Sequence, residues 1–322
     1  MNIFSIYTLK TLRKIYSKIS ANKIVSKPEC ERNPDKVSQI ITKSLLSNKP
    51  CMIARFGATE MTCLCNYIGI KYEKAQYFNY IRSKSNQWWW DQKVIDEMTA
   101  INGIFPATME SVGRFSELML QDISEVDILG SWLAQERLFE QRLANSINVW
   151  LDFLNPFFSK EPWSKALENK KVLVVHPFSE TIKQQYNKRE LLFKDPNVLP
   201  IFSLQTIKAV QSMSGNSTHF KNWFEALNHM QNEIDKCDYD ICIIGAGAYG
   251  FPLAAHVKRK GKKAIHLGGS LQLLFGIRGK RWEDPNLNKD YCFADFMNEY
   301  WVRPSEEETP LNAYIFEGAC YW

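Results

Sequence analysis

Short apolar runs separated by helical patterns constrain the fold of this chain most strongly. Residues 51–54, 171–175, 240–244 and 264–267 are such runs, and the last three are followed at once by glycine or histidine turns. Runs of four or five apolar residues bounded by turns are typical of parallel strands that are buried on both faces. The alternation predicts an α/β domain with a Rossmann-like, mainly parallel sheet flanked by helices.

Composition excludes several classes of protein. The 322 residues are 45% apolar and 13% aromatic, which is enough for a large core, yet no apolar run approaches the roughly 20 residues of a membrane-spanning helix. A formal net charge of +5 is too small to indicate nucleic acid, so none is expected as a partner. Eight cysteines without a CxxC pair favour reduced thiols and a cytoplasmic location.

A glycine turn follows the apolar run at residues 240–244. Gly245-Ala-Gly247-Ala-Tyr249-Gly250 fits the G-x-G-x-x-G pattern and opens a predicted helix, so backbone amides and the positive end of a helix dipole would face a phosphate. An NAD(P)-dependent oxidoreductase also needs an acidic residue about 20 positions later for the ribose. Residues 251–282 contain no aspartate or glutamate, so this alternative is the weaker one.

Positive charge surrounds the same turn. Eight lysines and arginines lie between residues 251 and 282, and three of them, Arg278, Lys280 and Arg281, fall in a glycine-containing loop. Helix lysines are often merely solvated, whereas cations in such a loop can reach a phosphate. These three residues are therefore predicted to bind the diphosphate of a nucleotide.

A second motif, Arg55-Phe-Gly57-Ala58-Thr-Glu60, follows the apolar run at residues 51–54. Ligands of open α/β sheets bind beyond the carboxyl ends of the strands, which is where this motif falls. A carboxylate there can serve as general base for an acceptor hydroxyl or as a ligand of a divalent cation. The alternative is an Arg55–Glu60 ion pair that only stabilises the turn.

The two motifs together resemble bacterial glycosyltransferases of the GT-D fold, in particular the GT-D-like branch. The resembling segments are Arg55 to Glu60 and Asp240 to Gly268. The resemblance implies transfer of a sugar from a nucleotide-sugar, usually a UDP-sugar, to a glycan acceptor in surface polysaccharide or glycoprotein biosynthesis. It implies a GT-D-like domain over residues 29–322, with Glu60 and Arg55 as the catalytic residues.

One position departs from the family pattern. The family motif commonly carries an aspartate two residues before the glutamate, where this chain has Ala58. Glu60 is then the one acidic ligand expected for Mn²⁺ or Mg²⁺, which weakens the expectation of a metal cofactor. A non-catalytic nucleotide-binding protein of a polysaccharide locus therefore stays open as the main alternative function.

Further candidates follow other predicted strands and motifs. His176 and the turn Gly268-Gly269-Ser270 come directly after apolar runs and are predicted to contact the nucleotide, together with Gly57 of the second motif. Gln211 and Ser212, after the segment 204–210, are weaker candidates for the same cleft. Trp89 and Trp90 of a Trp-Trp-Trp run are predicted to contact the acceptor sugar, because aromatic faces stack on sugar rings.

Residues 1–28 form a basic amphipathic segment. They include six lysines and arginines and no acidic residue, and Ile6, Leu9, Leu12, Tyr16 and Ile19 recur at helical spacing. Such a helix either lies on an anionic membrane surface or packs on its own domain. The first interpretation predicts peripheral contact with the inner face of the plasma membrane and suits a lipid-linked acceptor.

Overall fold

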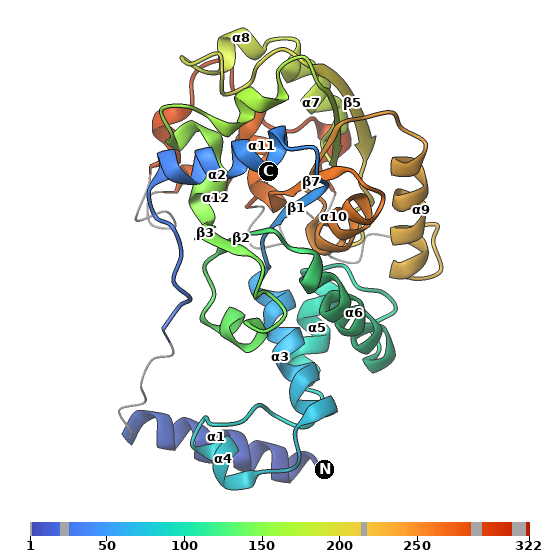
Figure 1. The fold of residues 1–322 in the computed structure, drawn as a ribbon. Helices are drawn as coiled ribbons and strands as arrows, with labels where there is room; N and C mark the ends of the chain where they lie inside the picture. Colours follow the sequence, from blue (N-terminus) through green and yellow to red (C-terminus); the bar gives the residue numbers. More distant parts are fainter. Residues whose placement is uncertain (1, 20–25, 214–217, 285–291, 311–319) are drawn as a thin grey trace.

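The computed structural model describes residues 2–19, 26–213, 218–284, 292–310 and 320–322. A seven-stranded sheet in the order β3-β2-β1-β7-β6-β4-β5 forms the centre, and its paired strands are all parallel (Figure 1). The strands are β1 (Cys51–Ala54), β2 (Ile128–Ser131), β3 (Ile147–Trp150), β4 (Lys171–His176), β5 (Ser203–Lys208), β6 (Ile241–Ile244) and β7 (Lys263–His266). The predicted Rossmann-like fold class is confirmed.

Helices cover both faces of this sheet, and further helices lie beyond it at one end of the molecule (Figure 1). Several begin where the sequence supplies a capping side chain: Asn33, Asp91, Thr108 and Asn222 each accept hydrogen bonds from backbone N–H groups of the first turn. The helices are α1 (Ile3–Ile19), α2 (Pro34–Leu46), α3 (Ala58–Tyr72), α4 (Tyr77–Ile81), α5 (Gln92–Ala100), α6 (Met109–Asp122), α7 (Ser179–Tyr186), α8 (Arg189–Leu192), α9 (Trp223–Asp235), α10 (Gly250–Arg259), α11 (Leu271–Leu274) and α12 (Lys280–Glu283).

Alternation along the strands divides the core between the two faces of the sheet. In β1, Met52 and Ala54 pack with α3, α5, α6, α9 and α10, whereas Cys51 and Ile53 pack with α2, α7, α8 and α11. Both sets are fully buried, so the central strands carry apolar residues at every position. This double burial is why the strands read as continuous apolar runs in the sequence.

Helix α1 lies with α4 at the end of the molecule far from the sheet (Figure 1). Leu9 is buried against Tyr80 and Trp89, and Lys10 Nζ forms an ion pair with Asp91 at 2.7 Å. One side of α1 therefore packs against α4 and the tryptophan run of the same chain. Leu12 and Ile19, expected on the same apolar stripe as Leu9, are exposed instead. Residues 20–25 of the predicted segment lie outside the described residues.

None of the helices in the described part of the chain is long and apolar enough to cross a bilayer.

The last glycine of the G-x-G-x-x-G pattern allows α10 to approach β7 closely. A Cβ atom built on Gly250 would lie 2.2 Å from Cε1 of His266, a ring that is itself buried. Gly113, in the interior of α6, differs because its nearest neighbours would be 3.8 Å away, which is an ordinary contact. The two glycines therefore provide a matched pair.

We expect Gly250→Ala to lower the free energy of unfolding by about 1–3 kcal/mol, since overpacking forces the His266 ring or the helix to move. Gly113→Ala is expected to raise it by about 0.5–1 kcal/mol, because alanine in a helix interior loses less backbone entropy. Urea unfolding followed by circular dichroism measures both. A Gly250→Ala protein as stable as the native one would contradict the close approach.

Candidate functional site

A cavity of about 160 Å³ lies at the carboxyl ends of β1, β4, β6 and β7. Parallel strands bring the residues that follow them to one edge of the sheet, and this is where open α/β folds bind ligands. Nine of the residues predicted from the sequence line it: Arg55, Gly57, Glu60, His176, Gly245, Gly247, Gly268, Gly269 and Arg281. Gln211 lines it too, and it was among the weaker candidates.

Arg55 supplies a cation at the centre of this edge. Its guanidinium lies over the ring of Trp132, with the guanidinium carbon 5.4 Å from the ring centroid. Among the ion pairs of the described residues, none joins a carboxylate to Arg55 within 4.0 Å, so the simple Arg55–Glu60 pair is not formed. Burial lowers the pKa of Arg55. A desolvated cation without a paired carboxylate favours the binding of an anion.

Trp132 is held in place to support that cation. Its indole N–H donates to the Phe56 carbonyl at 2.9 Å. The buried carboxylate of Glu136 accepts the Trp132 amide at 3.1 Å, and it also accepts the hydroxyl of Ser131. The first residues after β1 and β2 are thereby locked to each other.

Glu60 is the third residue of α3, and its carboxylate folds back over Gly57. A Cβ atom built on Gly57 would lie 1.3 Å from a carboxylate oxygen of Glu60, so any other residue at position 57 would displace it. Glu60 is buried, and desolvation raises the pKa of its carboxyl although the charge of Arg55 opposes this. A carboxyl with a raised pKa is suited to accept a proton from a hydroxyl.

The residues around Glu60 do not form a metal site by themselves. Among the described residues, no group of three or more histidine, cysteine, aspartate or glutamate side chains is arranged to hold a metal ion. Asn102 lines the cavity nearby, and its buried Oδ1 has no hydrogen-bond partner. One carboxylate and one amide oxygen leave most of a Mg²⁺ or Mn²⁺ shell to phosphate and water. The expected metal stays a prediction.

His176 is held as a neutral hydrogen-bond donor. Its Nδ1 accepts the amide N–H of Phe178 at 3.0 Å, and burial lowers the pKa of the imidazole to about 3. A neutral ring whose Nδ1 is an acceptor carries its proton on Nε2. His176 can therefore donate a hydrogen bond to a ligand oxygen, and its protonated Nε2 cannot serve as a base.

Glycines let the turns after three strands approach one another. A Cβ atom built on Gly245 would lie 2.6 Å from Cδ2 of His176 and 2.7 Å from the carbonyl oxygen of Gly268. Gly247 has a φ of +52°, which other residues rarely adopt, and no atom lies within 4 Å of a Cβ atom built on it. The backbone of the glycine turn is therefore accessible from the cavity.

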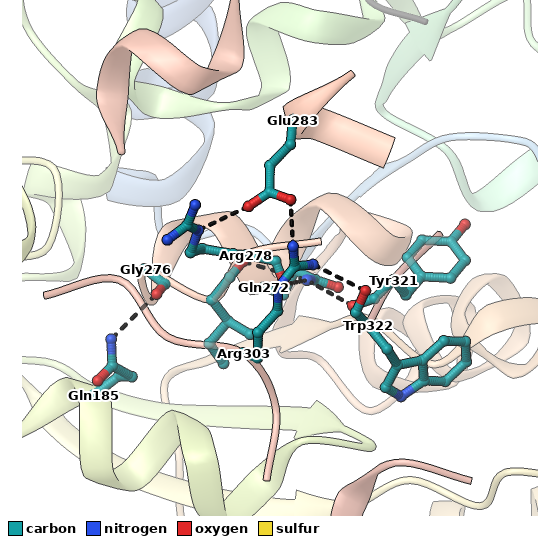
Figure 2. Close-up of polar contacts among 9 residues, drawn as sticks. Gln185, Gln272, Gly276, Arg278, Glu283, Arg303, Tyr321 and Trp322 are labelled. Atoms are coloured by element: carbon teal, nitrogen blue, oxygen red, sulfur yellow. Dashed lines mark hydrogen bonds and ion pairs between the residues drawn. The ribbon is translucent and has the colours of Figure 1, made fainter. Parts of the chain in front are cut away.

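Arg281, Tyr321 and Trp322 form a wall of the cavity that the sequence did not predict as a unit. Arg281 Nη1 donates to the Tyr321 hydroxyl at 2.8 Å. Gln272 Nε2 donates to the Tyr321 carbonyl at 3.1 Å, and Arg303 Nη1 donates to the Trp322 carbonyl at 2.9 Å (Figure 2). These bonds fix the backbone of the wall against the core.

Arg278 belongs to the support of that wall and does not line the cavity. Its Nε donates to Glu283 at 2.8 Å, and the other Glu283 oxygen contacts Arg303 (Figure 2). Gln185 strengthens the same region by donating to the Gly276 carbonyl at 3.1 Å. The phosphate contact predicted for Arg278 is thus not supported by its position.

Other predicted residues also lie outside the cavity lining. Tyr249 is buried, with its ring stacked on Trp223 at 4.6 Å and its hydroxyl bonded to Ser212 at 2.8 Å. Gly250 packs against His266, and Ser270 donates to the Leu267 carbonyl. Lys280 is exposed at the start of α12.

Trp89 and Trp90 pack against other side chains of the protein. Trp89 is buried in the cluster with Leu9 and Tyr80, and Trp90 packs against Tyr67 with ring centroids 6.1 Å apart. Neither residue lines the cavity. Their positions support a packing role, and contact with an acceptor stays an untested prediction.

The lysines and arginine at the end of α10 are used structurally. Lys258 pairs with Asp127 at 2.8 Å, Arg259 contacts Asp122, and Lys260 pairs with Asp235. They lie at the carboxyl end of the helix, whose other end faces the cavity. Of the eight lysines and arginines between residues 251 and 282, all of them described, Arg281 is the one that lines the cavity.

Sequence reasoning missed Trp132, Asn102 and Gln272. Trp132 carried a readable signal, because it follows the apolar residues of β2 as Arg55 follows β1. Asn102 comes from the loop after α5, and Gln272 is completely buried in α11. The last two positions carry no local pattern that points to a cavity.

An all-parallel sheet with a cationic, glycine-lined cavity at the carboxyl edge of its strands defines a Rossmann-like α/β protein. Comparison with protein families matches residues 32–274, most of the chain, to the GT-D-like family, described as a GT-D fold-like domain. The chain therefore belongs to the GT-D-like family, and the resemblance of its two motifs is confirmed. Comparisons with curated proteins and with solved structures gave no match.

Buried neutral histidines make stability depend on pH in a defined direction. Burial lowers the pKa of both His176 and His266 to about 3. In the unfolded chain, where the rings are not buried, the pKa of a histidine is 6.5. The unfolded state therefore binds more protons in acid, and stability is present above pH 6.5 and is lost as pH falls toward 3.

We expect each of these histidines to contribute a loss of roughly 2 kcal/mol in unfolding free energy between about pH 8 and about pH 5. His176→Gln should remove one such contribution, and the native protein is the reference. Urea unfolding at the two pH values measures it. Equal pH dependence in native protein and His176→Gln would contradict the buried neutral state.

Proposed function

We propose that this protein transfers a sugar from a nucleotide-sugar, with a UDP-sugar as the favoured donor, to a glycan acceptor of surface polysaccharide or glycoprotein biosynthesis. The observation that carries the proposal is the Arg55 guanidinium, which lies in the cavity with no carboxylate at ion-pairing distance among the described residues. The family fold is glycosyltransferase-like, which supports this class of chemistry.

The donor diphosphate would lie between Arg55 and the glycine turn. Arg55 and Arg281 supply positive charge, and His176 supplies a neutral N–H donor. The open backbone at Gly247 leaves room for phosphate oxygens to approach. Fixed donors of this kind stabilise the negative charge that develops on a leaving diphosphate.

Glu60 would activate the acceptor. In the transfer, the bond between the anomeric carbon and the diphosphate oxygen breaks, and its electron pair leaves with the nucleoside diphosphate. The acceptor hydroxyl oxygen bonds to the anomeric carbon, and its proton passes to the Glu60 carboxylate. Burial raises the pKa of that carboxyl, which makes it a better base for a hydroxyl proton.

Arg55→Gln tests the diphosphate site. We expect the affinity for UDP to fall roughly ten- to hundredfold, because a charge-assisted hydrogen bond contributes about 1.5–3 kcal/mol. Without ligand, the variant should melt at the same or a higher temperature, since it no longer buries a cation. Thermal shift and titration calorimetry with UDP, GDP, CMP and NAD, with and without Mn²⁺, measure both effects.

Arg114→Gln is the control, because Arg114 is exposed and lies over the Phe224 ring. UDP affinity that is unchanged in Arg55→Gln would remove the support for the site. Stabilisation by NAD alone would favour the oxidoreductase.

Glu60→Gln separates transfer from binding. The amide keeps the shape of the carboxylate over Gly57, so UDP binding should persist, while turnover should fall by roughly 10²–10⁴ because the base is lost. Release of UDP from a UDP-sugar in the presence of an acceptor extract measures turnover. Full activity in Glu60→Gln contradicts the assigned base, and native protein that binds UDP without any transfer favours the non-catalytic alternative.

A further inference from the structure

Exposed apolar side chains gather at the end of the molecule formed by α1 and α4. Among the described residues, fifteen large apolar side chains are exposed, and eight of them fall within residues 4–19 and 72–78. Scattered single exposures are normal on a soluble protein, whereas a cluster on adjoining elements indicates an interaction surface. The eight are Phe4, Tyr7, Leu12, Ile15, Ile19, Tyr72, Tyr77 and Phe78.

Helix α1 has two apolar sides rather than one. Leu9 packs into the cluster with Tyr80 and Trp89 on one side. At 3.6 residues per turn, the five exposed apolar residues of α1 fall on the opposite side, within an arc of about 140°. Phe4 and Ile19 lie near the first and last residues of the helix, and they are 80% and 81% exposed. The exposed side therefore runs the length of the helix.

The exposed side is bordered by positive charge. Lys14 and Lys18 are exposed and lie at one margin of the arc, and residues 2–19 contain no acidic residue. Two further cations of α1 serve its attachment: Lys10 pairs with Asp91, and Arg13 lies over the Tyr80 ring at 4.5 Å. Charge at the free margin thus complements an anionic partner.

Helix α1 is fixed to the protein by aromatic packing. The Trp88 ring contacts Tyr77, Tyr80 and Trp89 at centroid distances of 5.2, 5.8 and 5.0 Å. Tyr80 and Trp89 in turn bury Leu9. The tryptophan run thereby joins α1 to α4, where Phe78 is 78% exposed. The exposed residues of both helices belong to one attached unit.

We propose that α1 and α4 together form a docking surface for an anionic lipid bilayer, with α1 lying in the membrane interface. Aromatic and long aliphatic side chains beside lysines are the composition that the boundary between headgroups and acyl chains accepts. Lys14 and Lys18 would contact anionic headgroups, and Phe4, Ile15 and Ile19 would enter the acyl boundary. This inference does not depend on the proposed function.

Flotation with lipid vesicles tests the docking surface on the full chain. The native protein should float with vesicles of phosphatidylglycerol and phosphatidylcholine, and much less with phosphatidylcholine alone. Phe4→Glu with Ile15→Glu should weaken binding roughly a hundredfold or more, since two apolar side chains no longer leave water. Lys14→Glu with Lys18→Glu should weaken binding to the anionic vesicles roughly thirtyfold or more, and raised salt should weaken binding of the native protein in the same direction.

Ile201→Glu is the matched control, because Ile201 is exposed on another part of the molecule and its variant should float as the native protein does. Native protein that fails to float, or a Phe4→Glu, Ile15→Glu variant that floats unchanged, overturns the proposal. If the native protein is a dimer that does not bind vesicles, and Phe4→Glu with Ile15→Glu is a monomer, the surface serves self-association instead. UDP binding measured on the same variants should be unchanged, which separates this test from that of the cavity.

Discussion

A guanidinium without a paired carboxylate, placed at the middle of the sheet edge, is the interaction on which the candidate site depends. Arg55 follows β1, which lies between β2 and β7 in the sheet, and its guanidinium lies over the ring of Trp132, the residue that follows β2. Burial of that charge costs free energy in the absence of an anion. The surrounding fold must therefore hold Arg55 rigidly, and it does so through the Trp132–Phe56 and Trp132–Glu136 hydrogen bonds.

Glycines are as important as the charged residues at the carboxyl edge of the sheet, because they have no side chain that would fill the space. Gly57 leaves the space that the Glu60 carboxylate occupies, and Gly245 leaves the space where the turns after β4 and β7 meet. In both motifs, a glycine that follows a strand leaves room for another group to come close. At Gly57 this group is the Glu60 carboxylate, and at Gly245 it is the His176 ring and the Gly268 carbonyl. Any larger residue at these positions would separate the groups that the cavity brings together.

Residues that look functional in the sequence can instead be structural. Arg278 and the tryptophan run were natural candidates for phosphate and sugar, yet Arg278 supports the Tyr321–Trp322 wall through Glu283 and Arg303. Trp88 and Trp89 pack in the cluster that holds α1, and Trp90 packs against Tyr67. Residue type alone could not distinguish these roles, because arginine and tryptophan serve packing and recognition equally well. Only their neighbours in space decide between the two.

The sequence by itself determined the class of the fold and the two motifs that meet at the cavity. Strands buried on both faces must be apolar at every position, so β1, β4, β6 and β7 were readable, and parallel strands must bring Arg55, His176 and Gly245 to one edge. The tertiary structure alone decided which of the nearby cations face the cavity. It also placed Asn102 and Gln272 in the cavity wall and divided the apolar residues of α1 between a packed and an exposed side. These outcomes depend on contacts between distant segments, which local spacing does not encode.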